Sequence, residues 1–392
     1  MRNVVIVAGC RTPIGTIGGQ FKALTALDLS IPVMQNLISR SGIDPAIIDD
    51  VIWGCNYQRT YKENNLARVA AVTAGLPVTV PGITIHRNCT SSMSAIQMGF
   101  YQIRAGEADC IMAGGADSMS TAPHMVFNAR YGQKYGHMEL RDSMWDSLTN
   151  LGVGPAMGIT AENVAERYGI TREQMDAYAL RSQRRAVAAM DAGRFDEEII
   201  PVTVPSKKGD AVYTADEYPK RDATLEKLAK LKPSFKEGGK VTAGNASGMN
   251  DASSGVLLMA EDKAKELGCP ILARIISVAT TGVEPELMGI GPISSTRKAL
   301  EKAGLTVDDI DLFEINEAFA SQCLACQKEL GVPDEKLNVN GGGISLGHPV
   351  GATGSRIVIS LLYEMRRRGI RYGVATLCAG GGMGTAVVIE AC

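Results

Sequence analysis

Short apolar runs alternate with stretches of helical periodicity in the first third of the chain. Strands are predicted where β-branched and apolar residues run together, at residues 4–8, 51–54, 82–86 and 109–113. Helices are predicted where apolar residues recur every three or four positions, at residues 26–41, 65–74 and 92–105. This alternation predicts an α/β layer structure with a mostly parallel sheet.

The last third of the chain repeats this scheme. Strands are predicted at residues 272–279, 311–315, 338–340, 372–378 and 385–390. Helices are predicted at residues 294–303, 317–330 and 352–367. In both thirds a Gly-rich element precedes a buried helix, and a strand runs into glycines, at residues 113–115 and 378–382. We interpret the repetition as a tandem duplication of one α/β unit.

The middle of the chain, residues 119–250, breaks the alternation. A long amphipathic helix is predicted at residues 171–192, with one face made of Met175, Tyr178, Ala179, Ser182, Ala186 and Ala189. Residues 206–240 contain nine Lys or Arg against six acids, which is a net charge of +3. That window is either a solvated surface or a docking surface for an anionic ligand.

Composition narrows the class of protein. The 392 residues are 45% hydrophobic and 21% charged, which supports a large core and excludes intrinsic disorder. The net charge of −2 argues against a nucleic-acid binder. Apolar runs stay well short of the roughly 20 residues of a bilayer span, and the first is too short for a secretory signal. We therefore expect a cytoplasmic protein with no membrane partner.

The cysteines and histidines do not form a scaffold or a metal motif. Nine Cys is an odd number spread over a long chain, so a disulfide framework is not expected. The four histidines are scattered, which predicts no metal site; they are His86, His124, His137 and His348. Cys323 and Cys326 lie inside a helical pattern, and we interpret them as packing residues.

Three short segments contain residues with candidate chemistry. Cys89 lies where a strand ends and a helix begins, and the free N–H groups of a helix N-terminus favour a thiolate. His348 lies in the Gly-rich segment 340–349, where it can activate a thiol or donate to a substrate oxygen. Cys378 ends a strand before glycines whose N–H groups suit an oxyanion hole. Each segment also has a purely structural explanation, as a tight turn around a buried side chain.

Together these segments resemble the thiolase family. Residues 316–319 resemble its NEAF motif, residues 347–349 its GHP motif and residues 378–384 its CxGGGxG motif. Residues 242–248 resemble its CoA-binding loop, and residues 288–292 resemble another shared stretch. The resemblance extends over essentially the whole chain, with the motifs in order and at the family's spacing.

The resemblance implies a thiolase-like α/β fold of two duplicated halves in stacked helix and sheet layers. Residues 1–118 with 251–270 would form the N-terminal half, and residues 271–392 the C-terminal half. Residues 119–250 would form an inserted loop domain for CoA binding and oligomer contacts. Within it, residues 123–142 resemble the family's tetramer-forming loop, so a homo-oligomer, either a dimer or a tetramer, is expected.

The resemblance also implies an acyltransferase that makes or breaks a C–C bond, in the reaction 2 acetyl-CoA ⇌ acetoacetyl-CoA + CoA. Cys89 would be the nucleophile that becomes acylated, and His348 would help to deprotonate it. Cys378 would be the acid/base at the α-carbon. The backbone N–H groups of Cys89 and Gly380 would form one oxyanion hole, and His348 with a water held by Asn316 would form the other.

For the substrate, the resemblance implies contacts along the CoA arm. Ser247 would hydrogen-bond the pantetheine, close to Ala243 in the same loop. Lys220 and Arg221 would meet the nucleotide phosphates. An apolar slot would be lined by Met157, Met288, Ala318 and Phe319. CoA and acyl-CoA are substrates in this scheme, and neither a tightly bound cofactor nor a metal is required.

Two positions depart from the family pattern. Thr90 follows the nucleophile where Gly or Ala is usual, and Ala156 stands where acetoacetyl-CoA thiolases often have His. The second departure leaves a broader-chain 3-ketoacyl-CoA thiolase of fatty-acid β-oxidation as the alternative. A Cys/His thioester hydrolase would need only Cys89 and His348. A non-catalytic acyl-CoA-binding relative, for which Thr90 is the only hint, would have no chemical reason to keep all of Cys89, Asn316, His348 and Cys378.

Overall fold

A mixed sheet, ten-stranded within the described residues, runs through the centre of the molecule in the order β12-β13-β14-β11-β1-β10-β5-β3-β4, with β2 beside β10. The computed structural model describes residues 2–59 and 61–392. One half of the sheet contains β1 (Val4–Arg11), β2 (Gly15–Thr16), β3 (Asp50–Gly54), β4 (Gly82–Ile85), β5 (Cys110–Ser118) and β10 (Asn250–Ala260). The other half contains β11 (Ala273–Gly282), β12 (Leu312–Ile315), β13 (Tyr372–Ala379) and β14 (Met383–Ala391).

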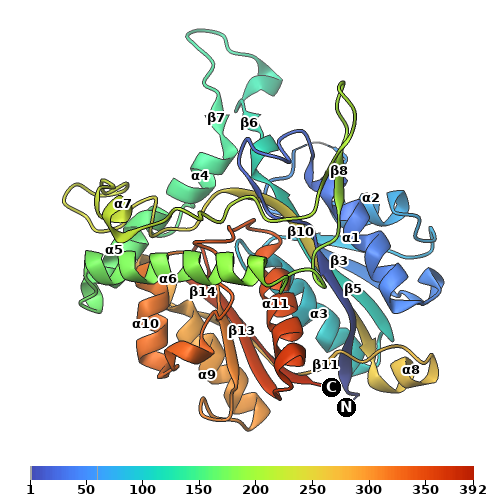
Figure 1. Cartoon of the computed structure of the whole chain (residues 1–392). Coiled ribbons are helices and arrows are strands. Elements are labelled where there is room, and N and C mark those ends of the chain that lie inside the picture. Colours follow the sequence, from blue (N-terminus) through green and yellow to red (C-terminus); the bar gives the residue numbers. More distant parts are fainter. Residues whose placement is uncertain (1, 60) are drawn as a thin grey trace.

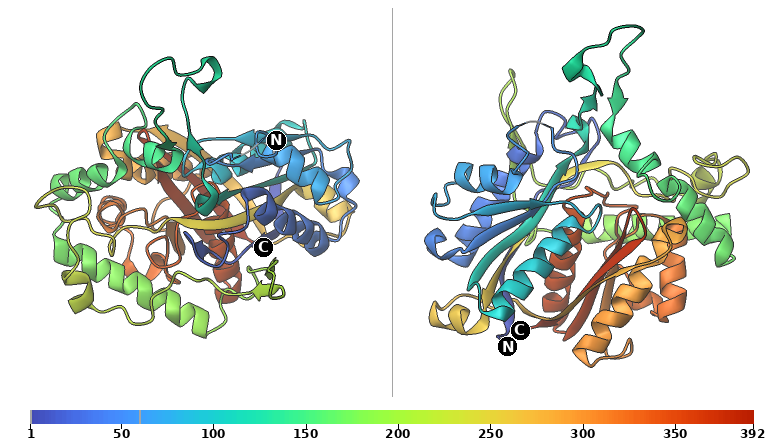
Figure 2. Two further views of the ribbon diagram at one scale, coloured as in Figure 1. Left: turned by 90° about the horizontal axis from the view of Figure 1, so that it is seen from above. Right: turned by 180° about the vertical axis from the view of Figure 1, so that it is seen from behind.

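Two helices lie between the halves and the others cover the outer faces (Figures 1 and 2). The inner helices are α3 (Ser91–Ala105), which contacts β5, β10 and β14, and α11 (Thr353–Arg368), which contacts β10, β13 and α3. The outer helices are α1 (Ala26–Ser41) and α2 (Leu66–Thr73) on one side, and α9 (Gly291–Ala303) and α10 (Ala320–Leu330) on the other. The predicted architecture of two α/β halves in stacked layers is confirmed.

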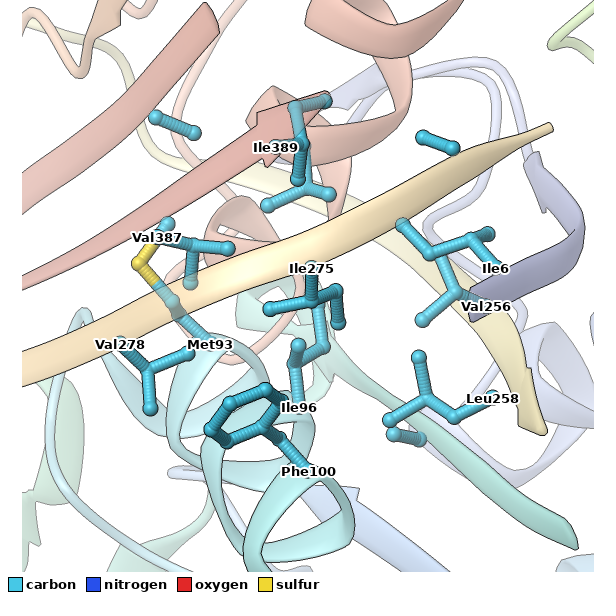
Figure 3. Packing of buried hydrophobic residues seen from close by; sticks show 14 of the residues in the cluster. Ile6, Met93, Ile96, Phe100, Val256, Leu258, Ile275, Val278, Val387 and Ile389 are labelled. Atoms are coloured by element: carbon cyan, nitrogen blue, oxygen red, sulfur yellow. The ribbon is translucent and has the colours of Figure 1, made fainter. Parts of the chain in front are cut away.

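The main core cluster is where α3 meets both halves of the sheet (Figure 3). Met93, Ile96 and Phe100 of α3 pack against Ile275 of β11 and Val387 of β14, and all five side chains are at most 3% exposed. Burying each such side chain stabilises the fold by about 1.5–3 kcal/mol. This cluster fixes α3, and therefore the turn that precedes it, against both halves.

The expectation of a mostly parallel sheet is wrong. Only the pairs β3–β4, β3–β5 and β12–β13 are parallel among the described strands, and the pairs along the centre are antiparallel. β13 and β14 are joined by a short hairpin over 380–382, which forces them to be antiparallel. β10 lies between β1 and β5, and its small polar first half gave no strand signal in the sequence.

Two further predicted elements differ in the C-terminal half. The helix predicted from 317 begins at Ala320, because Phe319 is extended and bridges to Ala246. The strand predicted at 338–340 is absent from the described strands, since Asn338 has a φ of 45°. Its side chain instead accepts from the N–H of Ile315 and donates to the carbonyl of Ile315, both at 2.8 Å, as a neighbouring strand would.

The central region forms an arm, a hairpin and a helical layer. Figure 1 shows the arm of β6 (His124–Met125) and β7 (Arg141–Asp142) projecting from the body. The helices are α4 (Ser143–Thr149), α5 (Met157–Arg167), α6 (Arg172–Asp191) and α7 (Leu225–Ala229), and β8 (Val202–Val204) pairs with β9 (Ala211–Tyr213). The predicted inner face of α6 is buried at all six positions. The short helix α8 (Glu261–Glu266) follows β10.

Short 3₁₀ turns complete the secondary structure, at Pro45–Ile47, Met119–Thr121, Ala129–Tyr131, Pro285–Ile290 and Asp334–Lys336. Within residues 2–59 and 61–392, every helix falls short of the length or the hydropathy that crossing a bilayer requires. In the same part of the chain, His, Cys, Asp and Glu side chains are nowhere grouped as ligands for a metal ion.

Candidate active site

The turn that contains Cys89 and the loop that contains His348 are brought together by two helix N-termini. Gly354 in the first turn of α11 lies against the backbone of Met93, and a side chain at that position would collide with it. The N–H of Ser355 donates to the hydroxyl of Ser92 at 2.9 Å. Because the two helices touch at their first turns, the loop that contains His348 lies beside the Cys89 turn, and Val350 of that loop lines the pocket at Cys89.

Cys378 joins this site from the end of β13, and the hairpin after it is tied to the Cys89 turn. Asn88 has a backbone φ of 46°, and its side chain donates to the carbonyl of Gly380 at 2.8 Å. The backbone N–H groups of Gly380 and of Cys89 itself lie close enough to the Cys89 sulfur to lower its pKa. The two donors predicted for an oxyanion hole therefore lie side by side.

Thr90, the departure beside the nucleophile, does not narrow the pocket. Its side chain is completely buried and its hydroxyl donates back to the carbonyl of Arg87 at 2.9 Å. The hydroxyl of Ser91 accepts from the N–H of Arg87 at 2.8 Å, which closes the same turn. Thr90 thus stabilises the turn from within. It is not among the residues that line the pocket at Cys89.

His348 and Asn316 place three unpaired polar atoms in the buried site. The Nδ1 atom of His348 is 2.7 Å from the Thr353 hydroxyl, while its Nε2 atom has no partner among the described residues. In the same part of the chain, both polar atoms of the Asn316 side chain are also without a partner. Buried polar groups are nearly always hydrogen-bonded. These atoms are therefore suited to hold a polar substrate atom or a water.

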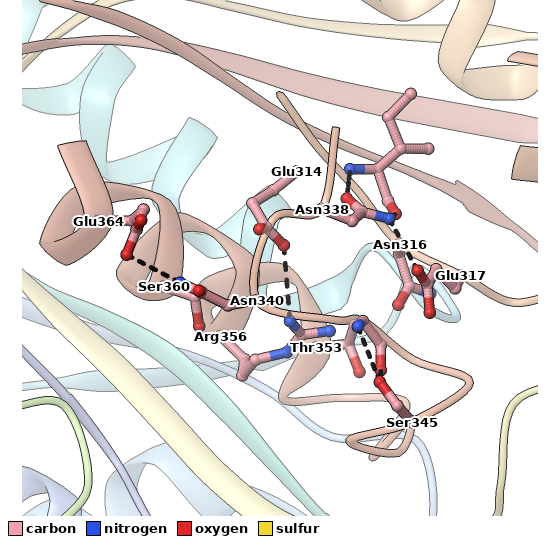
Figure 4. Close-up of polar contacts among 12 residues, drawn as sticks. Glu314, Asn316, Glu317, Asn338, Asn340, Ser345, Thr353, Arg356, Ser360 and Glu364 are labelled. Atoms are coloured by element: carbon pink, nitrogen blue, oxygen red, sulfur yellow. Dashed lines mark hydrogen bonds and ion pairs between the residues drawn. The ribbon is translucent and has the colours of Figure 1, made fainter. Parts of the chain in front are cut away.

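Glu317, which follows Asn316, is anchored by four hydrogen bonds, and Figure 4 draws the one from Asn338. The Glu317 carboxylate accepts from the hydroxyl of Ser182 at 2.6 Å, from Tyr178 at 3.1 Å and from Asn338 at 3.1 Å. It also accepts from the N–H of Ile344 at 3.1 Å. These bonds fix the backbone on the C-terminal side of Asn316, ahead of the helix that begins at Ala320.

The thiolate expected at Cys89 is not favoured in the free protein. Burial raises the pKa of Cys89 to about 11, which outweighs the two N–H groups that lower it. Burial, and then the neighbouring Cys89, raise the pKa of Cys378 well above its usual range. Burial, and then the cation of Arg356, lower the pKa of His348 to about 3. At neutral pH the site therefore contains two thiols and a neutral imidazole, and a proton must move during the reaction.

The residues predicted to line an apolar slot pack together around Cys378. Met288, Ala318 and Phe319 are buried in one cluster with Cys378, and Met157 packs against it. A second small pocket adjoins Cys89 and encloses about 40 Å³. Its walls are Asn56, Tyr57, His86, Asn88, Ser147, Leu148, Leu151, Met157, Val350 and Gly380. Space beside the nucleophile is thus limited.

The predicted CoA contacts lie along a path away from this pocket. Ser247 is half-buried, and its N–H donates to the carbonyl of Ala318 at 2.9 Å. Ala243 and Lys220 line a hollow of about 280 Å³ between α6 and α7. Arg221 is in a neighbouring hollow, where Asp191 holds its guanidinium through two bonds of 2.7 and 3.0 Å. The structure therefore leaves Lys220 freer than Arg221 to meet an anion.

Sequence reasoning missed several residues of the site. Phe235 packs edge-on against Phe319 with ring centroids 6.2 Å apart, and its ring covers Gly158. Leu148 and Leu151 come from the central region and form a wall beside Cys89. None of these residues is in a recognisable motif. The one available signal was the presence of aromatic residues in the Lys-rich window, and it did not distinguish Phe235 from Tyr213 and Tyr218.

Comparison with known proteins gives consistent matches over the full length. Residues 4–262 match the family model "Thiolase, N-terminal domain", and residues 269–391 match "Thiolase, C-terminal domain". An acetyl-CoA acetyltransferase of Syntrophomonas wolfei is 51% identical over 395 residues, which cover 100% of this chain and 99% of that protein. The crystal structure of the Bacillus anthracis acetyl-CoA acetyltransferase has a TM-score of 0.98 at 49% identity, covering 100% of this chain and 99% of the other. Human mitochondrial 3-ketoacyl-CoA thiolase in complex with CoA has a TM-score of 0.96 at 44% identity, covering 100% and 98%.

Proposed function

The chain belongs to the thiolase family, and from that premise we propose that it catalyses 2 acetyl-CoA ⇌ acetoacetyl-CoA + CoA. It is an acyltransferase, and its relatives include enzymes named acetyl-CoA acetyltransferase. The observation that carries the proposal is that Cys378 lies near enough to Cys89 to have its pKa raised by it, while the nearby His348 loop and the 316–319 segment supply buried side-chain atoms of His348 and Asn316 that have no partner among the described residues. Acyl transfer with C–C bond formation needs a nucleophile, a base at the α-carbon and a donor pair for each oxyanion.

In the first half-reaction, we propose that Cys89 attacks the thioester carbon of acetyl-CoA. Its proton passes to the free Nε2 of His348, a new S–C bond forms, and the bond to the CoA sulfur breaks. The CoA thiolate leaves with the proton from His348. The N–H groups of Cys89 and Gly380 would stabilise the tetrahedral oxyanion, and each such donor typically contributes roughly 3–4 kcal/mol to lowering the barrier.

In the second half-reaction, the Cys378 thiol would first give its proton to Nε2 of His348, and the resulting thiolate would take a proton from the methyl group of a second acetyl-CoA. The enolate oxygen would be stabilised by the Nε2–H of His348 and by a water on Asn316, whose polar atoms have no other partner among the described residues. The enolate carbon then attacks the acetyl group on Cys89, and the Cys89 sulfur leaves as a thiolate that recovers a proton from Cys378. Cys378 recovers its own proton from His348, so both thiols and the neutral imidazole are restored. This scheme uses no metal and no tightly bound cofactor.

Preference for a short acyl group is the first prediction. Because the pocket beside Cys89 encloses only about 40 Å³, an acetyl group fits better than a longer chain. Each methylene that does not fit costs about 1–3 kcal/mol. Thiolysis of acetoacetyl-CoA is therefore expected to be at least about tenfold faster than that of a ten-carbon 3-ketoacyl-CoA, measured by loss of enolate absorbance along a ladder of chain lengths.

A matched variant and an opposite outcome make this prediction sharper. Leu148→Ala removes part of the pocket wall, and it should raise the rate for six-carbon substrates relative to acetoacetyl-CoA. Equal rates for four and ten carbons in the unmodified protein would instead support a broader-chain 3-ketoacyl-CoA thiolase. That second function is kept because Ala156 replaces the His often present in acetoacetyl-CoA thiolases, and because a CoA-bound 3-ketoacyl-CoA thiolase is a close structural neighbour.

A role of Lys220 in CoA binding is the second prediction. Contacts to the nucleotide phosphates lie far from the reacting carbon, so they act as uniform binding and change KM more than kcat. Lys220→Ala should raise the KM for CoA about fivefold, which corresponds to about 1 kcal/mol. Arg221→Ala should have a smaller effect, because Asp191 already holds that guanidinium. In the double variant, the fold increases in KM of the two single variants should multiply.

Lys207→Ala is the control for this prediction. It removes the same charge from the turn between β8 and β9, where the side chain is exposed and does not line either hollow. Steady-state rates at varied CoA measure both constants. A fall in kcat with an unchanged KM for CoA at Lys220→Ala would place this residue in the chemical step instead.

A homo-oligomer is also part of the proposal. The arm between β6 and β7 presents large apolar side chains to solvent in the isolated chain, namely Phe127, Tyr131, Tyr135, Met138 and Leu140, which are 54–94% exposed. Exposed apolar side chains in such a group favour contact with another protein surface. Contact through this arm would support the tetramer over the dimer, and sedimentation of the full chain distinguishes the two. The cytoplasmic location stays a prediction from the sequence.

A further inference from the structure

In the hydrogen bond between His348 and Thr353, the imidazole is the donor and the hydroxyl is the acceptor. The Thr353 hydroxyl donates to the carbonyl of Pro349 at 2.8 Å. A hydroxyl has one proton to donate, so the Thr353 oxygen must accept in its 2.7 Å bond with Nδ1 of His348. The proton in that bond therefore belongs to the imidazole, and Nδ1 is the protonated nitrogen.

Backbone hydrogen bonds hold the Pro349 carbonyl, the Thr353 hydroxyl and the His348 imidazole in this donor and acceptor arrangement. Thr353 is the first residue of α11, and both its N–H and its hydroxyl donate to the carbonyl of Pro349, at 2.9 and 2.8 Å. The N–H of His348 donates to the side chain of Asn250 at 2.9 Å. Thr353 is completely buried, so water cannot take its place. The imidazole is thus held through its Nδ1, and the backbone that carries it is held through its N–H.

We propose that Thr353 is a positioning residue that holds His348 as the tautomer with a proton on Nδ1 and a free lone pair on Nε2. The inference rests on the proposed function, because it matters for a step in which His348 takes the proton of Cys89. Nε2 has no partner among the described residues and is the nitrogen left for the reaction. In the opposite tautomer Nε2 would carry a proton, and His348 would not be able to act as a base toward the thiol.

The proton balance of the step follows from this tautomer. The thiol proton of Cys89 moves to Nε2, the Cys89 sulfur forms its bond to the acyl carbon, and the imidazole becomes a cation with protons on both nitrogens. Thr353 continues to accept from Nδ1 while that charge is present. When the CoA thiolate leaves, it takes the proton from Nε2, and His348 returns to its original tautomer. No other reactant is needed.

The decisive experiment measures the tautomer directly. In protein labelled with ¹⁵N-histidine, the two ring nitrogens of His348 report by NMR which of them is protonated, and His348→Asn identifies its signals among the four histidines. We expect a protonated Nδ1 and an unprotonated Nε2 in the unmodified protein without substrate. Finding Nε2 protonated instead would overturn the inference, whatever the behaviour of any variant.

Variants then test the role of Thr353. Thr353→Val keeps the shape but removes the hydroxyl, and it should move His348 toward the other tautomer and lower kcat by about 10–100-fold, the cost typical of losing the outer hydrogen bond of a metal-ligating His. The KM for acetyl-CoA should change little. Thr353→Ser keeps the hydroxyl and should restore both the tautomer and most of the rate. An unchanged tautomer in Thr353→Val would overturn the proposal, even if activity fell.

A matched control separates this role from simple destabilisation. Thr296 on α9 is also completely buried, and its hydroxyl has no partner in the described residues. Thr296→Val should therefore leave both the His348 tautomer and kcat unchanged. Because the NMR measurement needs no substrate, it distinguishes failure of this inference from failure of the proposed reaction: a correct tautomer in a protein without acetyl transfer activity would refute only the latter.

Discussion

Replacement of Cys89 by Ser is expected to lower turnover by about 10³-fold or more while the protein still folds. Even the Cys89 thiol, with a pKa raised to about 11, needs help to lose its proton in this site. A serine hydroxyl is a far weaker acid than a thiol and a poorer leaving group in the reverse direction. Brief exposure of the unmodified protein to acetyl-CoA should place an acetyl group on the peptide that contains Cys89, as detected by mass spectrometry.

The other cysteines provide the control for this experiment. Cys269→Ser changes a partly buried thiol that does not line the pocket at Cys89, and it should keep both the acetyl adduct and the rate. Circular dichroism of Cys89→Ser checks that the fold is retained. An acetyl group found on Cys378 rather than Cys89 would mean that the two thiols have the opposite roles.

Replacement of Cys378 by Ala is expected to separate the two half-reactions. Formation of acetoacetyl-CoA should fall by about 10²–10⁴-fold, because a positioned general acid/base typically contributes that much. Exchange of acetyl groups between acetyl-CoA and labelled free CoA should continue, because Cys89, His348 and the N–H of Gly380 suffice for it. Comparing the two rates in one variant measures the role of Cys378 in C–C bond chemistry alone.

Cys326→Ala is the matched control for this pair of rates. Cys326 is also completely buried and lies close enough to Cys378 to influence its pKa, but it is part of α10 and contacts the carbonyl of Gly289. Both half-reactions should survive its loss. Equal loss of both half-reactions in Cys378→Ala would assign that residue to acylation or to folding. Steady release of free CoA from acetyl-CoA without any acetoacetyl-CoA, in the unmodified protein and in Cys378→Ala alike, would favour a thioester hydrolase that needs only Cys89 and His348.

The helical elements were largely predictable from the sequence. Periodicity placed α1 at its observed bounds and the buried face of α6 at all six positions, because the apolar face of a helix repeats within a few residues. Several strands were also recognisable, since β-branched runs such as those of β1 and β3 have a local signature. The segments with Cys89, His348 and Cys378 stood out through residue type and through the glycines around them.

Strand order and direction depended on contacts between distant parts of the chain. β10 is a central strand that is rich in small residues, and the tertiary structure gives one reason for this. Gly114 and Gly255, paired across β5 and β10, leave room for the ring of Trp53. The sequence of a strand with small residues does not indicate which distant side chain will pack against it. The side chain of Asn338, which replaces a strand beside Ile315, is a second case of the same kind.

By itself, the sequence determined the residues available for chemistry: two cysteines, one histidine and one asparagine at the ends of elements that its own periodicity predicts. Their protonation was decided by the tertiary structure, because desolvation depends on what surrounds a group in space. Helix-terminus reasoning predicted a thiolate at Cys89, yet burial raises its pKa to about 11. In the same way, the free nitrogen of His348 follows from Thr353, which reaches it only because α11 begins with its first turn folded back onto Pro349.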